Sequence, residues 1–129
     1  VLAGSAALID AARRWRMICG GGLRQAGILA AAGLHALDHH VARLADDHAR
    51  AEYLAEGLRD APSLRVSARH TNMVFIDVPA DRLQALAAHL DAHGIRASIG
   101  YLPQVRLVTH LDIDDAGIDR AIHAFQSFK

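Results

Sequence analysis

The feature that most constrains the fold is a proline-free segment, residues 23–59, in which apolar residues recur at steps of three and four. That spacing places them on one face of a helix. The charged residues fall mostly off this face, and Arg43 with Asp47 forms an i,i+4 pair of opposite charge. The segment is therefore predicted to be one long helix, or two helices broken near Gly33. The predicted apolar face comprises Leu37, Val41, Leu44, His48, Ala51, Ala55 and Leu58.

The hydrophobic pattern changes after Ala61-Pro62-Ser63, which stops the helix. The rest reads as β-β-α-β-β-α, a small α+β domain with helices on one face of a sheet. Asp81 is expected to cap the first of its helices, Gly94 to end that helix, and Asp114 to cap the second. We therefore predict an α/β fold class in two parts, residues 1–60 and residues 61–129. The four predicted strands are residues 64–68, 72–78, 95–99 and 104–109.

Composition sets broad limits on function. The chain has 129 residues, 52% hydrophobic and 22% charged, which is an ordinary globular balance. A formal net charge of zero gives no reason to expect nucleic acid or an anionic membrane as a partner. The longest mostly apolar stretch, residues 26–37, is shorter than the ~20 residues that span a bilayer. The single cysteine, Cys19, excludes an internal disulfide and is consistent with the cytoplasm, where we expect the protein.

A run of three glycines, residues 20–22, comes shortly before Arg24. A glycine run that opens a helix exposes backbone N–H groups at the positive end of the helix dipole. Such groups can hold a phosphate, and Arg24 could add a charge-assisted contact. The run matches neither a P-loop nor a dinucleotide-binding pattern. A plain loop between helices is the alternative, and composition alone favours it.

One arginine, Arg106, lies inside the apolar, strand-like run of residues 105–110. A buried guanidinium needs a partner, commonly a carboxylate that accepts two parallel hydrogen bonds. That partner could be a substrate or an internal aspartate. Composition by itself favours a third interpretation, an arginine on an edge strand that faces water.

The nine histidines form no recognisable metal motif. His35 with His39 and His89 with His93 are i,i+4 pairs that could each share a helix face, but no HExxH-type pattern or cysteine pair accompanies them. We therefore predict no metal site. His48 lies on the predicted apolar face and is expected to be a buried core histidine.

Several motifs, taken in order along the chain, carry a resemblance to a known family. Arg14-Trp15-Arg16, followed by the glycine run and Leu23-Arg24-Gln25-Ala26-Gly27, resembles the segment just after the cofactor lysine of low-specificity L-threonine aldolases. Further similarities to this family cover nearly the whole chain. They are Leu29-Ala30-Ala31-Ala32-Gly33, Ala36-Leu37, Arg43-Leu44-Ala45-Asp46-Asp47-His48-Ala49, Thr71-Asn72-Met73 and Val105-Arg106-Leu107-Val108-Thr109-His110-Leu111-Asp112.

The resemblance implies the C-terminal part of a fold type I enzyme that uses pyridoxal 5'-phosphate, with linking helices followed by a small domain. Such enzymes are dimers or tetramers with active sites at subunit interfaces, and they split threonine and other β-hydroxy-α-amino acids into glycine and an aldehyde. By the resemblance, Arg106 corresponds to the arginine that holds the substrate carboxylate. Arg24 corresponds to an arginine near the cofactor phosphate of a neighbouring subunit. Met17 stands where many relatives have a lysine.

The chain contains one lysine, Lys129. It is the last residue after an amphipathic helix, so we do not expect it to attach the cofactor, and the resemblance places the Schiff-base lysine upstream of Val1. No catalytic residue is therefore expected in this chain, which we interpret as the C-terminal portion of an enzyme whose N-terminal portion is its partner. Two alternatives stay open, another β-eliminating lyase of the same fold and a non-catalytic interaction module.

Overall fold

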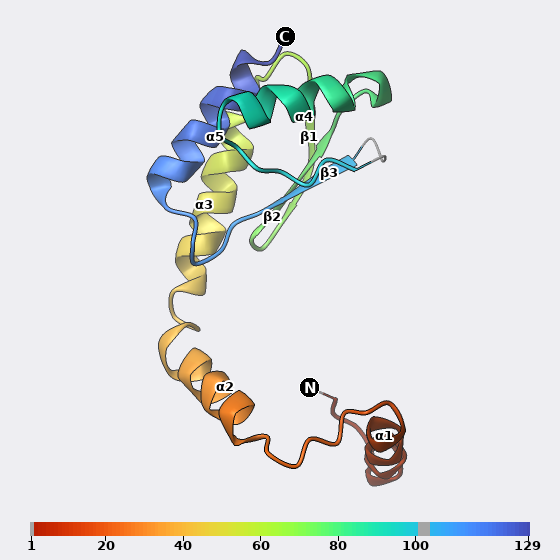
Figure 1. Cartoon of the computed structure of the whole chain (residues 1–129). Coiled ribbons are helices and arrows are strands. Elements are labelled where there is room, and N and C mark those ends of the chain that lie inside the picture. The colour runs from red at the N-terminus through yellow and green to blue at the C-terminus, as the bar shows by residue number, and fades with distance from the viewer. Residues whose placement is uncertain (1, 101–103) are drawn as a thin grey trace. The chain divides into compact units, whose positions relative to one another are not determined.

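The computed structural model describes residues 2–100 and 104–129, in two units that end and begin at Val41 and Ala42. The first unit contains helices α1 (Ala6–Ile18) and α2 (Gly27–His39) (Figure 1). Among the described helices, none has the length and apolarity needed to cross a bilayer. The domain boundary predicted near residue 60 stays a prediction.

In the described part of the second unit, three strands form an antiparallel sheet in the order β1-β2-β3. Helix α3 packs against α5 and against the first two strands, and Figure 1 shows α3 and α5 side by side. The elements follow one another as α3 (Leu44–Gly57), β1 (Arg65–His70), β2 (Met73–Asp77), a 3₁₀ turn (Ala80–Arg82), α4 (Leu83–Ala92), β3 (Gln104–Val108) and α5 (Asp115–Ser127).

The hydrophobic core lies in the second unit. Strand alternation turns Val74 and Ile76 of β2 inward, and both side chains are fully buried. Neither α1 nor α2 contains a buried residue. The core is formed by Ala51, Leu54, Leu58, Val74, Ile76, Val78, Leu83, Leu86, Leu90, Val105, Ile118, Ala124, Phe125 and Phe128.

The segment predicted as helical between residues 23 and 59 forms two helices, and the break lies at residues 40–43. Helix α2 runs through Gly33 without interruption, so the predicted position of the break is wrong. The true break contains neither glycine nor proline, the two residues that mark helix ends most clearly in a sequence.

Helix α3 buries a face that is rotated from the predicted one. Asp47, Ala51 and Leu54 are buried, whereas His48 is exposed. The prediction of a core histidine at His48 is therefore wrong. A carboxylate can take the buried position because Arg43 neutralises Asp47 through an ion pair at 2.8 Å, as the i,i+4 spacing predicted.

Helix α5 starts at its predicted cap, because Oδ1 of Asp114 accepts a hydrogen bond from the N–H of Gly117 at 2.7 Å. The other predicted cap is wrong. Asp81 lies inside the 3₁₀ turn, and α4 begins after Arg82 without a side-chain cap. The 3₁₀ turn already leads the backbone into the helix, and the N–H of Arg82 donates to the carbonyl of Pro79 at 2.9 Å.

The strand predicted at residues 95–99 is not formed. Gly94, at φ +70°, ends α4 as predicted, and the N–H of Ile95 then donates to the carbonyl of Leu90 at 2.8 Å. The N–H of Ile99 closes a tight turn onto the carbonyl two residues before it. Because these N–H groups are bonded locally, the segment does not pair with the sheet. The order of elements after α3 is therefore β-β-α-β-α.

The C-terminal end of β3 is tied to the β1–β2 turn and to α3. The side-chain amide of Asn72 donates to the carbonyl of Thr109 at 2.8 Å, and the N–H of Thr109 donates back to the carbonyl of Asn72 at 2.9 Å. The buried hydroxyl of Thr109 donates to the carbonyl of Asp47 at 2.7 Å. In the same turn Thr71 adopts φ +49°, a left-handed conformation that β-branched residues rarely occupy.

The N-terminal end of β3 is tied to the rest of the sheet through Asp77. Strand register places Asp77 opposite both Arg65 and Gln104. The carboxylate accepts hydrogen bonds from Ser67 at 2.9 Å, Arg65 at 2.6 Å and Gln104 at 3.5 Å. The Ser67 hydroxyl is the largest cause that lowers the pKa of Asp77, and Gln104 and Arg65 add to it against the opposing effect of desolvation. Arg106 lies between the two tied ends.

Replacement of Asn72 tests the tie at the C-terminal end of β3. Asn72→Ala should lower the free energy of unfolding by about 1–2 kcal/mol, because a partly buried carbonyl loses its donor. Urea denaturation followed by circular dichroism measures the change. Thr71→Gly is the control in the same turn and should be neutral or stabilising, since glycine accepts a positive φ. Equal losses in the two variants would contradict a specific role of the amide.

The lowered pKa of Asp77 predicts an acid-sensitive fold. The folded carboxylate stays ionised at a pH where the unfolded chain already binds a proton. Its stabilising effect is therefore present above the unfolded carboxyl pKa, about 3.9, and is lost as the pH falls through the folded value. Asp77→Asn should lose less stability than the natural chain between about pH 7 and about pH 3, as measured by urea denaturation at each pH. The same loss in both proteins would rule this explanation out.

The distribution of burial predicts different responses of two leucines in the 129-residue chain. The side chain of Leu86 is 0% exposed and that of Leu34 is 61% exposed. Leu86→Ala should cost about 2–5 kcal/mol of unfolding free energy, whereas Leu34→Ala should change it by less than about 0.5 kcal/mol. Chemical denaturation of the two variants checks this difference. A large loss at Leu34 would mean that the isolated chain buries this side chain, for example by self-association.

Candidate functional site

A pocket of about 550 Å³ lies beside the edge strand β3 in the second unit. Residues 94–98, residues 106–110 and several turns of α5 line it. The lining also includes the buried side chains of Ile118 and Phe125. This volume falls in the range of pockets that hold small molecules.

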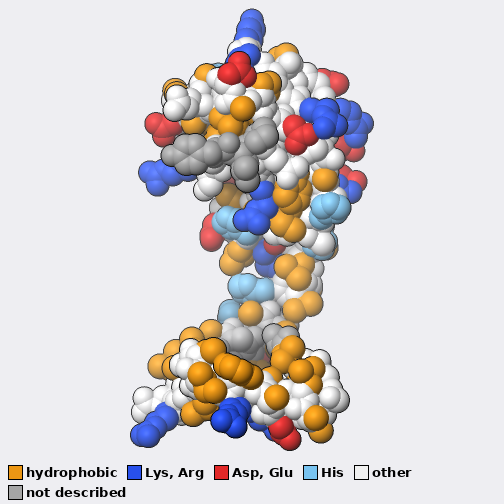
Figure 2. Space-filling view, turned by 90° about the vertical axis from the view of Figure 1, so that its right-hand side faces the viewer, with side chains coloured by type: hydrophobic (Ala, Val, Ile, Leu, Met, Phe, Trp, Pro, Cys, Tyr) orange, Lys and Arg blue, Asp and Glu red, His pale blue; other side chains and the backbone are white. Residues whose placement is uncertain are grey.

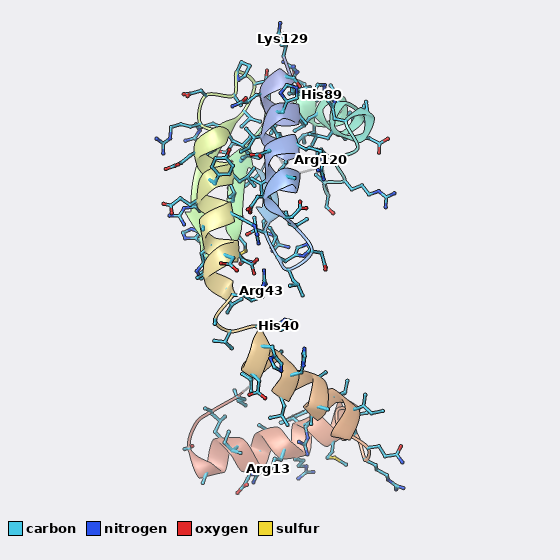
Figure 3. The ribbon with its side chains drawn as sticks, turned by 90° about the vertical axis from the view of Figure 1, so that its left-hand side faces the viewer. Arg13, His40, Arg43, His89, Arg120 and Lys129 are labelled. Carbon is cyan, nitrogen blue, oxygen red and sulfur yellow. The ribbon has the colours of Figure 1, made fainter. Side chains whose placement is uncertain are left out.

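The charged residues that line this pocket are all basic. They are Arg96, Arg106 and Arg120, with His110 beside them, and none of the described aspartates or glutamates lines the pocket. Figure 3 labels Arg120, which projects from α5. Within residues 2–100 and 104–129, no ion pair joins any of the three arginines to a carboxylate. The pocket, called the cationic pocket below, therefore combines positive charge with apolar surface, which suits a small organic anion.

Arg106 takes an exposed position on β3, directly opposite Phe75 in the strand register. The neighbouring Val105 is buried, so strand alternation turns Arg106 away from the core. The position is on an edge strand and also in the pocket lining, and it would leave the guanidinium accessible to a carboxylate. The role of Arg106 in substrate binding stays a prediction.

The glycine run ends α1 and does not open the next helix. Gly20 adopts φ +79°, and the N–H of Gly21 donates to the carbonyl of Arg16 at 2.8 Å. The interpretation of the run as a helix opening is therefore wrong, because these N–H groups satisfy the last carbonyls of α1. The run lies in the connection between α1 and α2, the alternative that composition favoured. Helix α2 starts later, after Ala26, which makes no side-chain capping hydrogen bond.

Arg24 is exposed in the loop before α2. The first turn of α2 has no acidic residue and no side-chain cap, so its N–H groups are open to an anion. A cation beside a helix N-terminus is an arrangement that suits a phosphate. Arg24 belongs to the first unit and Arg106 to the second, so each predicted residue is described within its own unit.

The two predicted histidine pairs do share helix faces. The ring centroids of His35 and His39 are 4.5 Å apart, and those of His89 and His93 are 4.3 Å apart. The Nε2 atom of His89 is hydrogen-bonded to the carbonyl of Ala124 at 2.8 Å. In the part of the chain that the structure describes, no three histidine, cysteine or acidic side chains gather as metal ligands.

Lys129 lies at the end of the chain and points away from the fold of the second unit (Figure 3). Its backbone carbonyl accepts a hydrogen bond from Arg82. It does not line the cationic pocket.

The first unit carries most of the large exposed hydrophobic side chains, and Figure 2 shows them gathered on its surface. An α2 helix that is apolar on nearly all sides normally lies inside a protein. This apolar surface includes Leu8, Trp15, Met17, Ile18, Ile28, Leu29, Leu34 and Leu37.

Sequence reasoning missed two members of the cationic pocket, Arg96 and Arg120. They come from the extended segment after α4 and from α5, and no helical or strand spacing relates them to each other or to Arg106. It also missed the hydrogen bonds between Asn72 and Thr109, because the two residues are far apart in the chain.

Comparison with known proteins finds the beta-eliminating lyase family over residues 1–81. The chain is 46% identical to the low specificity L-threonine aldolase of Escherichia coli strain K12 over 113 residues, which are 88% of this chain and 33% of that protein. It is 37% identical to the probable low-specificity L-threonine aldolase 2 of Arabidopsis thaliana over 131 residues, 98% of this chain and 37% of that protein. The chain thus spans about a third of the length of these relatives. Since the family match covers more than half of the residues, the chain belongs to the beta-eliminating lyase family.

Proposed function

We propose that this chain is part of an enzyme that cleaves L-threonine, L-allo-threonine and related β-hydroxy-α-amino acids into glycine and an aldehyde. The observation that carries the proposal is the 46% identity, over 88% of the chain, to a protein named low specificity L-threonine aldolase. The cationic pocket supports it, because the substrate of such a reaction carries a carboxylate.

In this proposal Arg106 holds the α-carboxylate of the substrate. The guanidinium is exposed, it lines a pocket without acidic side chains, and its strand is tied at both ends. A planar guanidinium can donate two parallel hydrogen bonds to a carboxylate, which fixes the orientation of the amino acid as well as its position. Orientation matters because it decides which bond to Cα can break.

The family implies pyridoxal 5'-phosphate as cofactor, and the residues of this chain fit a supporting role toward it. Arg24, beside the open N–H groups at the start of α2, would hold the phosphate, and we propose that it does so for a neighbouring subunit. Lys129, the only lysine of the sequence, is not among the residues that line the pocket, so in this proposal the attachment lysine would be supplied by another portion of the enzyme. When bound, the cofactor supplies the sink for the electrons of the broken bond.

The apolar surface of the first unit supports a place within a larger assembly. We propose that this surface packs against the N-terminal portion of the enzyme within a dimer or tetramer. In that arrangement residues 1–60 would complete the cofactor domain and its linking helices, and residues 61–129 would form the small domain. Side chains such as Ile28, which is 84% exposed, would become buried in the contact with the N-terminal portion.

A second candidate reaction is β-elimination, which the description of the matching family favours. The same carboxylate contact would serve it, but the products differ. Incubation of the complete enzyme with threonine or with serine separates the two, because aldol cleavage releases glycine and elimination releases ammonia and a keto acid. Release of ammonia and keto acid without glycine would replace the first proposal by the second.

The role of Arg106 predicts a specific kinetic change in the complete enzyme. Arg106→Ala should raise KM for threonine by about 10- to 100-fold, because one or more charge-assisted hydrogen bonds to the carboxylate are lost. Arg106→Lys should recover only part of the loss, since lysine cannot make the paired contact. Arg59→Ala, at an exposed arginine outside the pocket, is the control and should leave KM unchanged. An unchanged KM in Arg106→Ala would remove this residue from the substrate site.

A further inference from the structure

The cationic pocket holds more positive charge than one carboxylate requires. Arg96, Arg106 and Arg120 come from three different elements and line the same space. If Arg106 binds the α-carboxylate, two arginines face the pocket with no anion assigned to them. Such an excess raises the electrostatic cost of the empty pocket and favours a second anionic group in it.

The four acidic residues of segment 112–119, next to the pocket, have partners other than Arg96 and Arg120. Asp112 lies 3.6 Å from His110, Asp114 caps α5 through the N–H of Gly117, Asp115 pairs with Arg50 at 2.7 Å, and Asp119 accepts the hydroxyl of Tyr53 at 2.9 Å. None of these four carboxylates is among the side chains that line the pocket. The residues outside the described ranges, Val1, Tyr101, Leu102 and Pro103, carry no carboxylate either. Asp91 lines a neighbouring hollow together with Arg96. Even so, no ion pair in the described ranges joins Arg96 or Arg120 to a side-chain carboxylate.

Five of the thirteen arginines form ion pairs with aspartate or glutamate in the described ranges, and the other eight, including the three of the pocket, form none. Arg120 lies near the first turn of α5, where its terminal nitrogen is 3.8 Å, and Oδ1 of Asp114 3.0 Å, from the position a Cβ would take at Gly117. The two side chains form no ion pair. Arg96 is exposed on an extended segment whose neighbours Ile95 and Ala97 pack against the core, which fixes the backbone that carries it.

We infer that the pocket selects β-hydroxy-α-amino acids whose side chain ends in a second anionic group, a carboxylate or a phosphate ester. Arg106 binds the α-carboxylate, and Arg96 and Arg120 bind the second group. This inference rests on the proposed aldol cleavage. A pocket of about 550 Å³ has room for such a substrate.

β-Hydroxyaspartate is the smallest substrate of this kind. Its Cα–Cβ bond breaks, the proton of the β-hydroxyl is lost as the aldehyde carbonyl forms, and a proton is added at Cα. The products are glycine and glyoxylate, and the reaction needs no oxidant or reductant.

Binding of non-reacting anions to the complete enzyme, loaded with cofactor, tests the pocket by calorimetry. Succinate should bind about 10- to 100-fold more tightly than propionate, because it adds a second charge-assisted contact. The double variant Arg96→Gln/Arg120→Gln should lose this preference, whereas the control Arg59→Gln should keep it. Equal binding of the two acids, or an unchanged preference in the double variant, would overturn the inference. 3-Phosphonopropionate separates the two anion types, since tighter binding than succinate indicates a phosphate ester and weaker binding a carboxylate.

Kinetics separate this inference from the function on which it rests. The ratio of kcat/KM for β-hydroxyaspartate to kcat/KM for threonine should fall by at least about 10-fold in the double variant and stay constant in Arg59→Gln. Glycine release from threonine without any preference for succinate would overturn the second anionic subsite alone. A preference for succinate without glycine release from either amino acid would overturn the aldolase proposal and leave an anion pocket of another purpose.

Discussion

Hydrogen bonds at the two ends of β3 hold the strand that carries Arg106. At one end Asp77 of β2 accepts hydrogen bonds from β1 and β3, and at the other the Asn72 amide and the Thr109 hydroxyl join the strand to a hairpin and to α3. β3 is an edge strand, so the described sheet supports it through one neighbour only. The hydrogen bonds at both ends of β3 compensate for the missing second neighbour. They explain how Arg106, whose side chain is exposed, can have a defined backbone position.

The two units differ in how much apolar surface they bury. The second unit contains the core and the cationic pocket, and its helices contribute apolar faces to a single cluster. The first unit contributes no buried residue, and its exposed leucines and isoleucines have the composition of a protein interior. The apolar side chains of such a segment stabilise the protein only when another surface covers them and removes them from water. This agrees with relatives about three times as long as the chain.

Local signals in the sequence predicted part of the local structure, and the rest depends on hydrogen bonds and packing that the sequence pattern does not show. Asp114 and Gly94 act as predicted because a cap and a left-handed glycine depend only on nearby atoms. Residues 95–99 have the alternation of a strand and partly bury alternate side chains, but the N–H groups of Ile95 and Ile99 form local hydrogen bonds. His48 was misplaced because packing against α5 and the first two strands, which are distant in the sequence, decides which face of α3 is buried. Arg106 was found through a motif, whereas Arg96 and Arg120 join it only in the folded chain.

The position of the single tryptophan has a consequence for spectroscopy. Trp15 lies on α1, 63% exposed and outside the core. The intrinsic tryptophan fluorescence of this chain therefore reports on the surroundings of the first unit. It should change little when the core around Phe125 unfolds. The same property makes it a sensor of association, since any protein surface that covers the indole moves it from water into an apolar environment and shifts its emission to shorter wavelength.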